Sequence, residues 1–279
     1  MKNNLDGLRI LIPTRGRTGQ QTTLRSLPPV LQRMTTLVAH SEEVAALRHN
    51  YAELGMDVVA QSAPISNIAE KRAWMMRWAA PRYERVIMLD DDCYFFARCP
   101  VVDRAWLEDK SYWLPNPGKK LLSVAYATPK KLESAFAELN TLLRERGHAG
   151  LCSRNGNHVE KREVATTARM MHAIGYDTAV FAKKVKTKNR VLVREDFDYT
   201  LQLLRAGYDN AVIFHTCVSP GSYGAKGGCS DERTVELSNR EAQKLADLHP
   251  GLVRVVQKEY NNVPRQEVVV SWRKALNHG

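Results

Sequence analysis

A short apolar run that ends in three adjacent carboxylates is the feature that most limits how this chain can fold. Residues 85–89 are followed directly by Asp90, Asp91 and Asp92. The run is too short for a helix and too apolar for a loop, so it predicts a buried strand. Ligands bind at the carboxyl ends of strands in open α/β sheets, and adjacent like charges are costly without a cation. The triplet therefore predicts a divalent-metal site, with a solvated acidic turn or a helix-capping cluster as the alternative.

The segments before this run predict a parallel, doubly wound sheet. Apolar strands alternate with helices, an order that produces parallel strands joined by helical crossovers. Ser41 and Ser66 are the expected caps of the second and third helices. The predicted strands are 8–12, 36–40, 56–60 and 86–89, and the predicted helices are 22–31 (broken or ended near Pro28), 41–54 and 67–80. We therefore expect an α/β fold with a mostly parallel sheet flanked by helices.

The remainder of the chain is less regular. A polar segment at 147–158 predicts a loop over a site, and the glycine-rich segment 219–229 predicts a mobile lid or a substrate loop. Glu195 and Asp196 open a predicted helix that continues to 205, and His215 ends a predicted strand. The other predicted elements are a strand at 121–126, a helix at 130–146, a C-terminal helix from 239, and strands near 253–256 and 268–270.

Composition limits the class of protein. Of 279 residues, 44% are hydrophobic and 25% are charged, which favours a soluble globular protein. No run of about 18 apolar residues could cross a bilayer, and the first residues lack a secretory signal, so we expect a cytoplasmic protein without a membrane partner. Five scattered cysteines without a CxxC pair argue against a disulfide framework and a structural zinc site.

The formal net charge of +11 favours polyanionic partners, which include nucleic acid and nucleotide phosphates. The basic loop that follows the first strand contains Thr14, Arg15 and Arg17, and it could present backbone N–H groups and guanidinium groups to a phosphate or a nucleobase. Aromatic residues make up only 8% of the chain, so the composition indicates no dedicated stacking platform for single strands.

We expect the acidic groups to divide the chemistry between them. Asp90 and Asp92 would hold a divalent ion, because alternate residues of a strand point the same way. Asp91 would face a ribose or the other side of the turn. The ion would neutralise a diphosphate leaving group, and either Glu195 or Asp196, with Asp196 favoured, would be the general base for an acceptor hydroxyl.

Each of the other candidate residues has a purely structural alternative. Glu195 and Asp196 could simply complement a helix dipole. His215 is a candidate metal ligand, but a lone histidine at a strand end is often an ordinary packed residue. Lys71 and Arg72 could contact a phosphate or could belong to a solvated helix face.

Three motifs, at 10–17, 86–92 and 195–196, together resemble those of GT-A fold glycosyltransferases. The resemblance implies a UDP-sugar donor, with Mn²⁺ or Mg²⁺ on Asp90 and Asp92, Asp196 as the base and His215 as a last metal ligand. It also implies that Pro13, Thr14 and Arg17 lie near the uracil, with Glu42 nearby. The sequence departs from the family where Arg15 and Gly16 replace the usual aromatic-Asn pair.

Within that fold, the segment 193–198, the Gly-Gly-Cys loop ending near Arg233 and the basic charge are similar to the phage-type, TET-associated glycosyltransferases. Those enzymes transfer sugar to the hydroxymethyl group of modified pyrimidines in DNA. The resemblance implies a DNA acceptor carrying 5-hydroxymethylcytosine or 5-hydroxymethyluracil. The candidates for its binding are Arg154, His158, Lys161, Arg162, Lys226 and Arg233.

We expect one domain over 1–279. Its parts would be a nucleotide-sugar-binding half at 8–100, an acceptor and catalytic half at 101–235, and a C-terminal extension at 236–279. The sequence assigns no oligomeric state.

Three other classes of protein compete with this interpretation. A haloacid-dehalogenase-type phosphatase would need a small Gly-Thr-like turn after the second aspartate, where Cys93 and Tyr94 stand instead. A sugar nucleotidyltransferase uses the same sheet and metal-diphosphate chemistry. A non-enzymatic nucleic-acid-binding module would fit the basic charge, but its clustered carboxylates would repel phosphate.

Overall fold

The computed structural model describes residues 4–62, 65, 67–99, 123–154, 160, 162–221, 234–260 and 263–277. Its centre is a ten-stranded mixed sheet. The strands are β1 (Leu8–Pro13), β2 (Thr35–Ala39), β3 (Asp57–Ala60), β4 (Arg85–Leu89), β5 (Cys93–Cys99), β6 (Ser123–Tyr126), β7 (His148–Ser153), β8 (Val164–Thr166), β9 (Ala173–Asp177) and β10 (Ala211–Pro220). They lie in the order β3-β2-β1-β4-β9-β7-β10-β5-β6, with β8 beside β10.

The first four strands form the parallel half of the sheet. β1 lies between β2 and β4, and β3 pairs with β2, all in the same direction. All five residues of β2 and all five of β4 are buried, as expected for strands covered on both faces. The doubly wound arrangement predicted from the first ninety residues is therefore confirmed.

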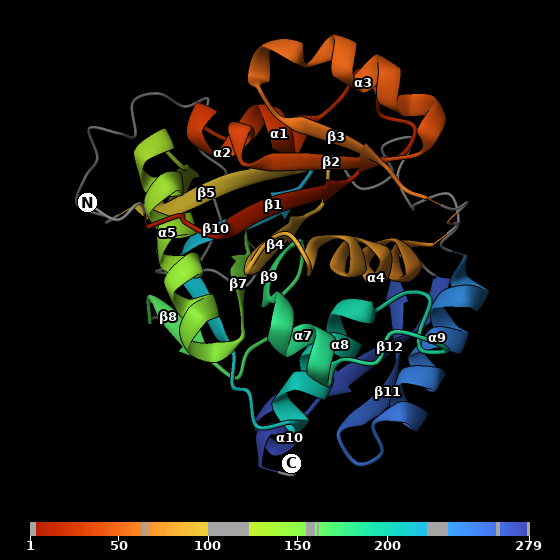
Figure 1. The fold of residues 1–279 in the computed structure, drawn as a ribbon. Helices are drawn as coiled ribbons and strands as arrows, with labels where there is room; N and C mark the ends of the chain where they lie inside the picture. The colour runs from red at the N-terminus through yellow and green to blue at the C-terminus, as the bar shows by residue number, and fades with distance from the viewer. Residues whose placement is uncertain are drawn as a thin grey trace.

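Helices cover both faces of the sheet (Figure 1). Ile10 and Ile12 belong to the core under one helical layer and Leu11 to the core under the other, because successive strand residues alternate between faces. The first layer consists of α1 (Thr22–Ser26), α2 (Pro29–Arg33), α3 (Val44–Asn50) and α5 (Pro129–Arg146). The second consists of α4 (Ile68–Ala79), α7 (Thr178–Lys184) and α8 (Glu195–Arg205).

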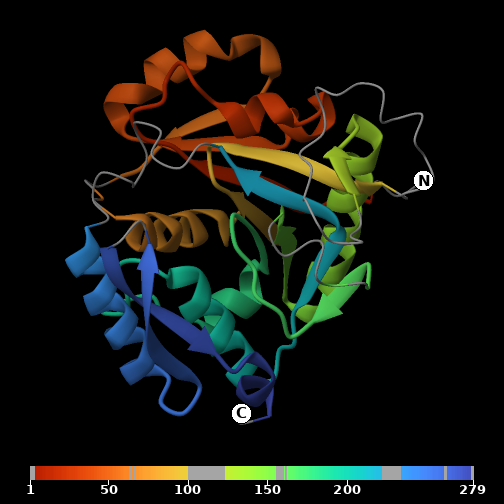
Figure 2. The same cartoon turned by 180° about the vertical axis from the view of Figure 1, so that it is seen from behind.

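The second half of the sheet mixes the two directions. β9 is antiparallel to both β4 and β7, and β10 is parallel to β7 but antiparallel to β5 and β8. Figure 2 shows β5 and β10 side by side. β6, β7 and β10 therefore run in the direction of β1 to β4, so the expectation of a mostly parallel α/β sheet is confirmed. Sequence patterns predicted none of β5, β7, β8 and β9.

The prediction of a loop at 147–158 is wrong for the first part of this segment, which forms the central strand β7. Two close contacts explain why this strand contains the polar and small residues that favoured a loop in the prediction. His148 is buried, and its Nε2 lies 2.8 Å from the carbonyl oxygen of Tyr208. Gly150 approaches the next strand so closely that an added Cβ would lie 2.6 Å from the carbonyl oxygen of Ala173. Residues 155–158 lie outside the described residues.

The strand predicted at 211–215 is longer than expected. β10 continues to Pro220 after a shift in its register with β7 between Ile213 and Cys217, so His215 lies within the strand and not at its end. Only the first residues of the predicted lid, up to Gly221, belong to the described part of the chain.

Helix boundaries differ from the predictions in small ways. The helix predicted at 22–31 is broken before Pro29, as expected. The helix predicted at 41–54 begins as a 3₁₀ turn and its α-helical part ends at Asn50, with a second 3₁₀ turn at 52–54. Asn67 caps α4 by accepting a hydrogen bond from the N–H of Glu70, whereas the predicted cap, Ser66, lies outside the described residues.

The C-terminal part packs against α8. It consists of α9 (Val235–Leu248), the antiparallel hairpin of β11 (Val253–Tyr260) and β12 (Val263–Val270), and α10 (Trp272–Leu276). Phe197 and Leu201 of α8 share a core with Leu245 and Leu252. The helix predicted from 239 thus begins four residues earlier, and both predicted strands are longer. In the described part of the chain, no helix is long and apolar enough to cross a membrane.

Candidate active site

The basic loop after β1 lies against the aspartate triplet because β1 and β4 are adjacent and parallel. Arg17 forms a buried ion pair with Asp91. The Thr14 hydroxyl donates a hydrogen bond of 3.2 Å to the same carboxylate, and Gln21 donates one of 2.7 Å to that hydroxyl. The first loop and the aspartate triplet are therefore in direct contact.

Asp91 is the inward-facing member of the triplet. Burial raises the pKa of Asp91 to about 6, although the neighbouring Arg17 acts in the opposite direction and Asp92 and Asp90 add to the increase. The carboxylate of Asp91 is directed into the first loop. Of the two orientations expected from the sequence, toward a ribose or toward the other side of the turn, the structure has the second. Its contacts are those of a residue that holds the loop to the triplet.

Arg72 joins the triplet to α8. It donates a hydrogen bond of 2.5 Å from Nη2 to Asp90 Oδ1, and another of 2.5 Å from Nη1 to Glu195 Oε1. Burial by itself would lower the pKa of Arg72, but the charges of Glu195 and Asp90 outweigh it and raise the pKa above its ordinary value. The guanidinium thus holds the first turn of α8 beside the end of β4.

His172 is a contact of the triplet that sequence analysis did not assign to the site. Its Nδ1 lies 2.7 Å from Asp90 Oδ2, and its carbonyl oxygen accepts a 3.0 Å hydrogen bond from the Asp90 N–H. The residue has a φ of +63°, in the left-handed region that is uncommon for a side-chain-bearing residue. Only the pairing of β9 with β4 brings it to Asp90, and no local motif announces it.

Asp90 and Asp92 are the partly exposed members of the triplet. Their side chains are 29% and 28% exposed. Asp92 Oδ2 lies 3.5 Å from Arg17, and the Asp92 carbonyl oxygen accepts a 2.6 Å hydrogen bond from the N–H of Gly221. This last contact brings the end of β10 to the triplet.

These two carboxylates fit a cation that shares its coordination with a substrate. Hard carboxylate oxygens suit Mg²⁺ or Mn²⁺. Within the described residues, no group of three His, Cys, Asp or Glu side chains could hold a metal ion. Mg²⁺ commonly keeps several waters and binds one or two carboxylates together with substrate phosphates. The donor set therefore fits an open metal-diphosphate site and does not form a closed protein cage.

The two acidic residues at the start of α8 have different environments. Glu195 is buried, with its side chain only 3% exposed, and is bonded to Arg72. Asp196 is half-buried, and its carboxylate makes no hydrogen bond or ion pair within the part of the chain that the structure describes. The Asp196 carboxylate is therefore the one of the pair whose oxygens are open to an external partner.

His215 is not brought to the triplet. Its Nε2 lies 2.8 Å from Glu138 Oε2 on α5, and its Nδ1 lies 3.0 Å from the hydroxyl of Thr216. The neighbouring Thr216 pairs with Ala97 on β5, five residues beyond Asp92, which corresponds to about 17 Å of extended strand. The structure therefore pairs His215 with a carboxylate on a helix instead of with Asp90 or Asp92.

Lys71 is buried at the same site. Its Nζ donates a 2.7 Å hydrogen bond to the Thr14 carbonyl oxygen. Lys71 and Arg72 are both buried, so the alternative of a solvated helix face is wrong. Both side chains bind groups of the protein, and contact with a donor phosphate stays a prediction.

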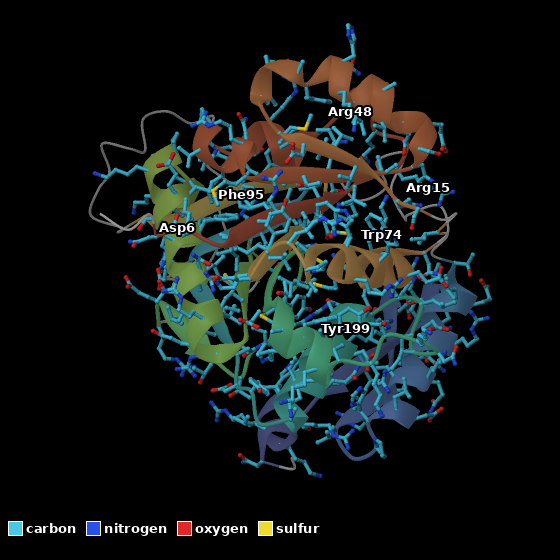
Figure 3. All side chains as sticks on the ribbon, in the orientation of Figure 1. Asp6, Arg15, Arg48, Trp74, Phe95 and Tyr199 are labelled. Atoms are coloured by element: carbon cyan, nitrogen blue, oxygen red, sulfur yellow. The ribbon has the colours of Figure 1, made fainter. Side chains whose placement is uncertain are left out.

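The outer side of the first loop is exposed. Pro13 is the last residue of β1 and is buried, whereas Arg15 and Glu42 are exposed. Arg15 lies at the outer edge of the molecule (Figure 3). The N–H of Gly16 donates a 2.6 Å hydrogen bond to Glu43 Oε1, so the neighbour of the predicted Glu42 is the residue that binds the loop.

The predicted acceptor-side residues are only partly described. The Arg154 guanidinium lies 4.7 Å from the ring centroid of Phe96, and Arg162 forms a 2.6 Å ion pair with Glu160. His158, Lys161, Lys226 and Arg233 lie outside the described residues.

A model of the TET-associated glycosyltransferase family matches residues 8–218 of this chain. No curated protein matches the sequence significantly.

Similar solved structures include three enzymes of low sequence identity. Mannosyl-3-phosphoglycerate synthase from Rubrobacter xylanophilus is 10% identical over 94% of this chain and 84% of that chain, with a TM-score of 0.48. GalNAc-T7 with UDP, GalNAc and Mn²⁺ is 11% identical over 76% and 43%, with a TM-score of 0.44. The 4-diphosphocytidyl-2C-methyl-D-erythritol synthase from Anaerococcus prevotii is 12% identical over 87% and 99%, with a TM-score of 0.41.

Proposed function

Because this chain belongs to the TET-associated glycosyltransferase family, we propose that it transfers a sugar from a UDP-sugar to the hydroxymethyl group of a modified pyrimidine in DNA. Family membership makes the chain a glycosyltransferase. The nucleotide, the metal and the acceptor are the proposed part of this assignment.

One observation carries the proposal. The Arg72 guanidinium binds Asp90 after β4 and Glu195 at the start of α8, which lie far apart in the sequence. A metal-dependent transferase that inverts the anomeric carbon uses a cation at the donor diphosphate and a base at the acceptor, on the two sides of one sugar ring. The bridge through Arg72 supports this arrangement, since it joins the candidate metal carboxylates to the helix turn that carries Asp196.

Asp90 and Asp92 would hold Mn²⁺ or Mg²⁺, with the remaining coordination supplied by water and the donor diphosphate. When bound, the ion would supply charge neutralisation for the departing nucleoside diphosphate. Arg17 and Arg72 hold the carboxylates in place through ion pairs with Asp91, Asp92 and Asp90.

Asp196 would accept the proton of the acceptor hydroxyl. The hydroxyl oxygen forms the new bond to the anomeric carbon as the bond to the diphosphate oxygen breaks, and the released proton passes to the carboxylate. A positioned base of this kind contributes roughly 10²- to 10⁴-fold to a rate. The half-buried Asp196 suits this role better than Glu195, whose carboxylate is buried and bonded to Arg72.

The first loop would bind the donor nucleoside. Pro13, Thr14 and Arg17 line the inner side of this loop, whereas Arg15 and the nearby Glu42 are exposed on its outer side. Lys71 fixes the loop through the carbonyl oxygen of Thr14 and would act on the donor mainly by keeping that loop in place.

The DNA acceptor is supported by charge and by family membership. A net charge of +11 attracts the phosphate backbone in a salt-dependent manner. A hydroxymethyl group inside a duplex cannot reach a catalytic base unless its nucleotide is extruded, which costs a few kcal/mol. We therefore expect single-stranded or mismatched sites to be modified faster than fully paired ones.

The test uses the full chain with a panel of UDP-sugars and Mn²⁺, with EDTA as the metal-free control. Acceptors are oligonucleotides that carry 5-hydroxymethylcytosine or 5-hydroxymethyluracil, matched with unmodified versions. UDP release and a gain of one glycosyl residue in the oligonucleotide mass should both require the hydroxymethyl group and the metal. Folded protein that gives neither product with any donor would contradict the proposal.

Two variants and one control sharpen this test. Asp92→Asn should abolish the metal-dependent reaction, and Asp196→Asn should slow transfer at least about 100-fold while donor binding persists. Glu53→Gln neutralises an exposed carboxylate on the 3₁₀ turn after α3 and should leave transfer unchanged. A separate incubation with UTP and a sugar 1-phosphate tests the alternative, because formation of a UDP-sugar with release of pyrophosphate would identify a nucleotidyltransferase.

A further inference from the structure

Two exposed tyrosines lie close to the aspartate triplet. Tyr94 is 39% exposed and Tyr126 is 38% exposed, and they are the most exposed aromatic side chains among the described residues. The other large hydrophobic residues exposed to this degree, Val263 and Val269, belong to the β11–β12 hairpin. Adjacent exposed aromatic rings next to a candidate active site are typical of a ligand-binding surface.

Strand register places both tyrosines on the face of the sheet that carries α4, α7 and α8. Tyr94 is two residues before Phe96 on β5, and Phe96 is opposite Tyr126 on β6. Phe96 belongs to the core under those helices, so Tyr94 and Tyr126 share its face. β5 begins at Cys93, directly after Asp92, so this face begins at the candidate metal site.

The three rings form one contact cluster, which we call the aromatic shelf (Tyr94, Phe96 and Tyr126). Tyr126 stacks on Phe96 with ring centroids 4.8 Å apart and an interplanar angle of 26°. Tyr94 meets Tyr126 edge to face at 6.1 Å. Phe96 is buried, so the Tyr126 ring packs on a side chain of the core and Tyr94 packs in turn on Tyr126.

A guanidinium group borders the aromatic shelf. The Arg154 guanidinium lies 4.7 Å from the Phe96 ring centroid, where it can stack on the ring and still offer N–H groups to an anion. Planar aromatic surface next to an arginine is the combination that binds an unpaired nucleobase together with its phosphate. The net charge of +11 favours the same polyanionic ligand.

We propose that the aromatic shelf is the platform on which the acceptor nucleobase stacks while its hydroxyl group reaches the anomeric carbon of the donor sugar. The inference rests on the proposed function, because it takes the acceptor to be a nucleic acid. Tyr94 and Tyr126 provide the stacking surface, Arg154 binds the adjacent phosphate, and the base edge points toward Asp92. Since stacking does not read the base edge, the shelf holds any extruded pyrimidine and leaves the choice of base to other groups.

The test compares Tyr94→Ala and Tyr126→Ala with the conservative variants Tyr94→Phe and Tyr126→Phe. Each alanine variant should raise the KM for a hydroxymethylated oligonucleotide about 10-fold, in line with the loss of one stacking contact, and the phenylalanine variants should restore it. The slow release of UDP by hydrolysis without acceptor should keep its rate in all four. Val263→Ala, at a comparably exposed site on the hairpin, is the control.

A second measurement does not depend on sugar transfer. A short single-stranded oligonucleotide with 2-aminopurine at the acceptor position reports stacking through quenching of its fluorescence. Quenching by the wild-type protein and by the phenylalanine variants, and its loss in the alanine variants, would support the shelf even if no sugar donor gave a product. Thermal unfolding of each variant checks that the fold is intact.

Two results would overturn the inference. Unchanged KM and unchanged quenching in the folded alanine variants, with DNA glycosylation intact, would remove the shelf and leave the proposed function standing. Self-association of the wild-type protein that the alanine variants abolish, with KM unaffected, would make the shelf a protein interface.

Discussion

Replacing Arg72 with alanine should destabilise the protein strongly, because it leaves the buried Glu195 carboxylate without its cation. The Glu195 side chain is only 3% exposed, and Arg72 approaches it to 2.5 Å. Removing one partner of a buried ion pair costs about 3–5 kcal/mol. Each kcal/mol lowers the melting temperature by about 2–4 °C in domains of about 150–250 residues, so we expect a decrease of roughly 6–20 °C at pH 7.

Two further variants separate charge from shape. Arg72→Lys keeps a positive charge but lacks the two-pronged geometry that binds Asp90 and Glu195 together, so stability should be largely retained while catalysis falls. The double variant Arg72→Met with Glu195→Gln removes both buried charges, and it should regain most of the stability lost in Arg72→Ala. It should remain inactive, because nothing then joins Asp90 to α8.

Differential scanning calorimetry on the wild type, Arg72→Met, Glu195→Gln and their double variant gives the coupling free energy between the two positions. A melting temperature of Arg72→Ala within about 1 °C of the wild type would refute the reasoning. Additive effects of the Arg72 and Glu195 substitutions on the free energy of unfolding would also refute the reasoning, since residues joined by a buried ion pair must be coupled.

Two other predictions concern stability. Burial lowers the pKa of His148 from 6.5 to about 4, so the unfolded chain binds a proton at a higher pH than the folded chain. The contribution of neutral His148 to the free energy of unfolding is therefore complete above pH 6.5. It falls by about 3 kcal/mol as the pH decreases from 6.5 to 4. Urea unfolding across this range should show a flatter pH dependence for His148→Gln, and an unchanged slope would contradict the assignment. Gly150→Ala places a Cβ 2.6 Å from the Ala173 carbonyl oxygen and should cost about 1–3 kcal/mol in guanidinium unfolding. Gly19→Ala is the control, because its added Cβ meets no atom within 4 Å. Equal stability of the Gly150→Ala and Gly19→Ala variants would contradict the prediction, since β7 and β9 would then separate enough to admit a methyl group.

Sequence patterns predicted the first half of the fold because local signals sufficed there. Each strand from β1 to β4 is a short apolar run, and Pro13 and Pro28 mark real boundaries. β7 was missed since its polar and small residues, His148 and Gly150, serve close contacts with neighbouring strands. Those contacts join segments far apart in the chain, and no window of the sequence contains both partners.

The site divides in the same way. The aspartate triplet and the acidic start of α8 are short motifs, so the sequence alone brought them to attention. Their connection through Arg72 joins residues 123 positions apart, and the contact of His172 with Asp90 joins residues 82 apart. The aromatic shelf was hidden for another reason. The aromatic content of 8% is an average over the whole chain and does not show local clusters. The pairing of β5 with β6 brings three aromatic side chains together at one place.

The hydrogen bond of 2.6 Å from the Gly221 N–H to the Asp92 carbonyl oxygen has an evolutionary consequence. The polypeptide leaves the end of β10 from a point fixed against the aspartate triplet, with space so limited that a Cβ on Gly221 would lie 3.2 Å from that oxygen. Segments of different length or composition grafted after this position would therefore all originate beside the candidate active site. Descendants of such an enzyme could exchange what they recognise there while inheriting the same chemistry.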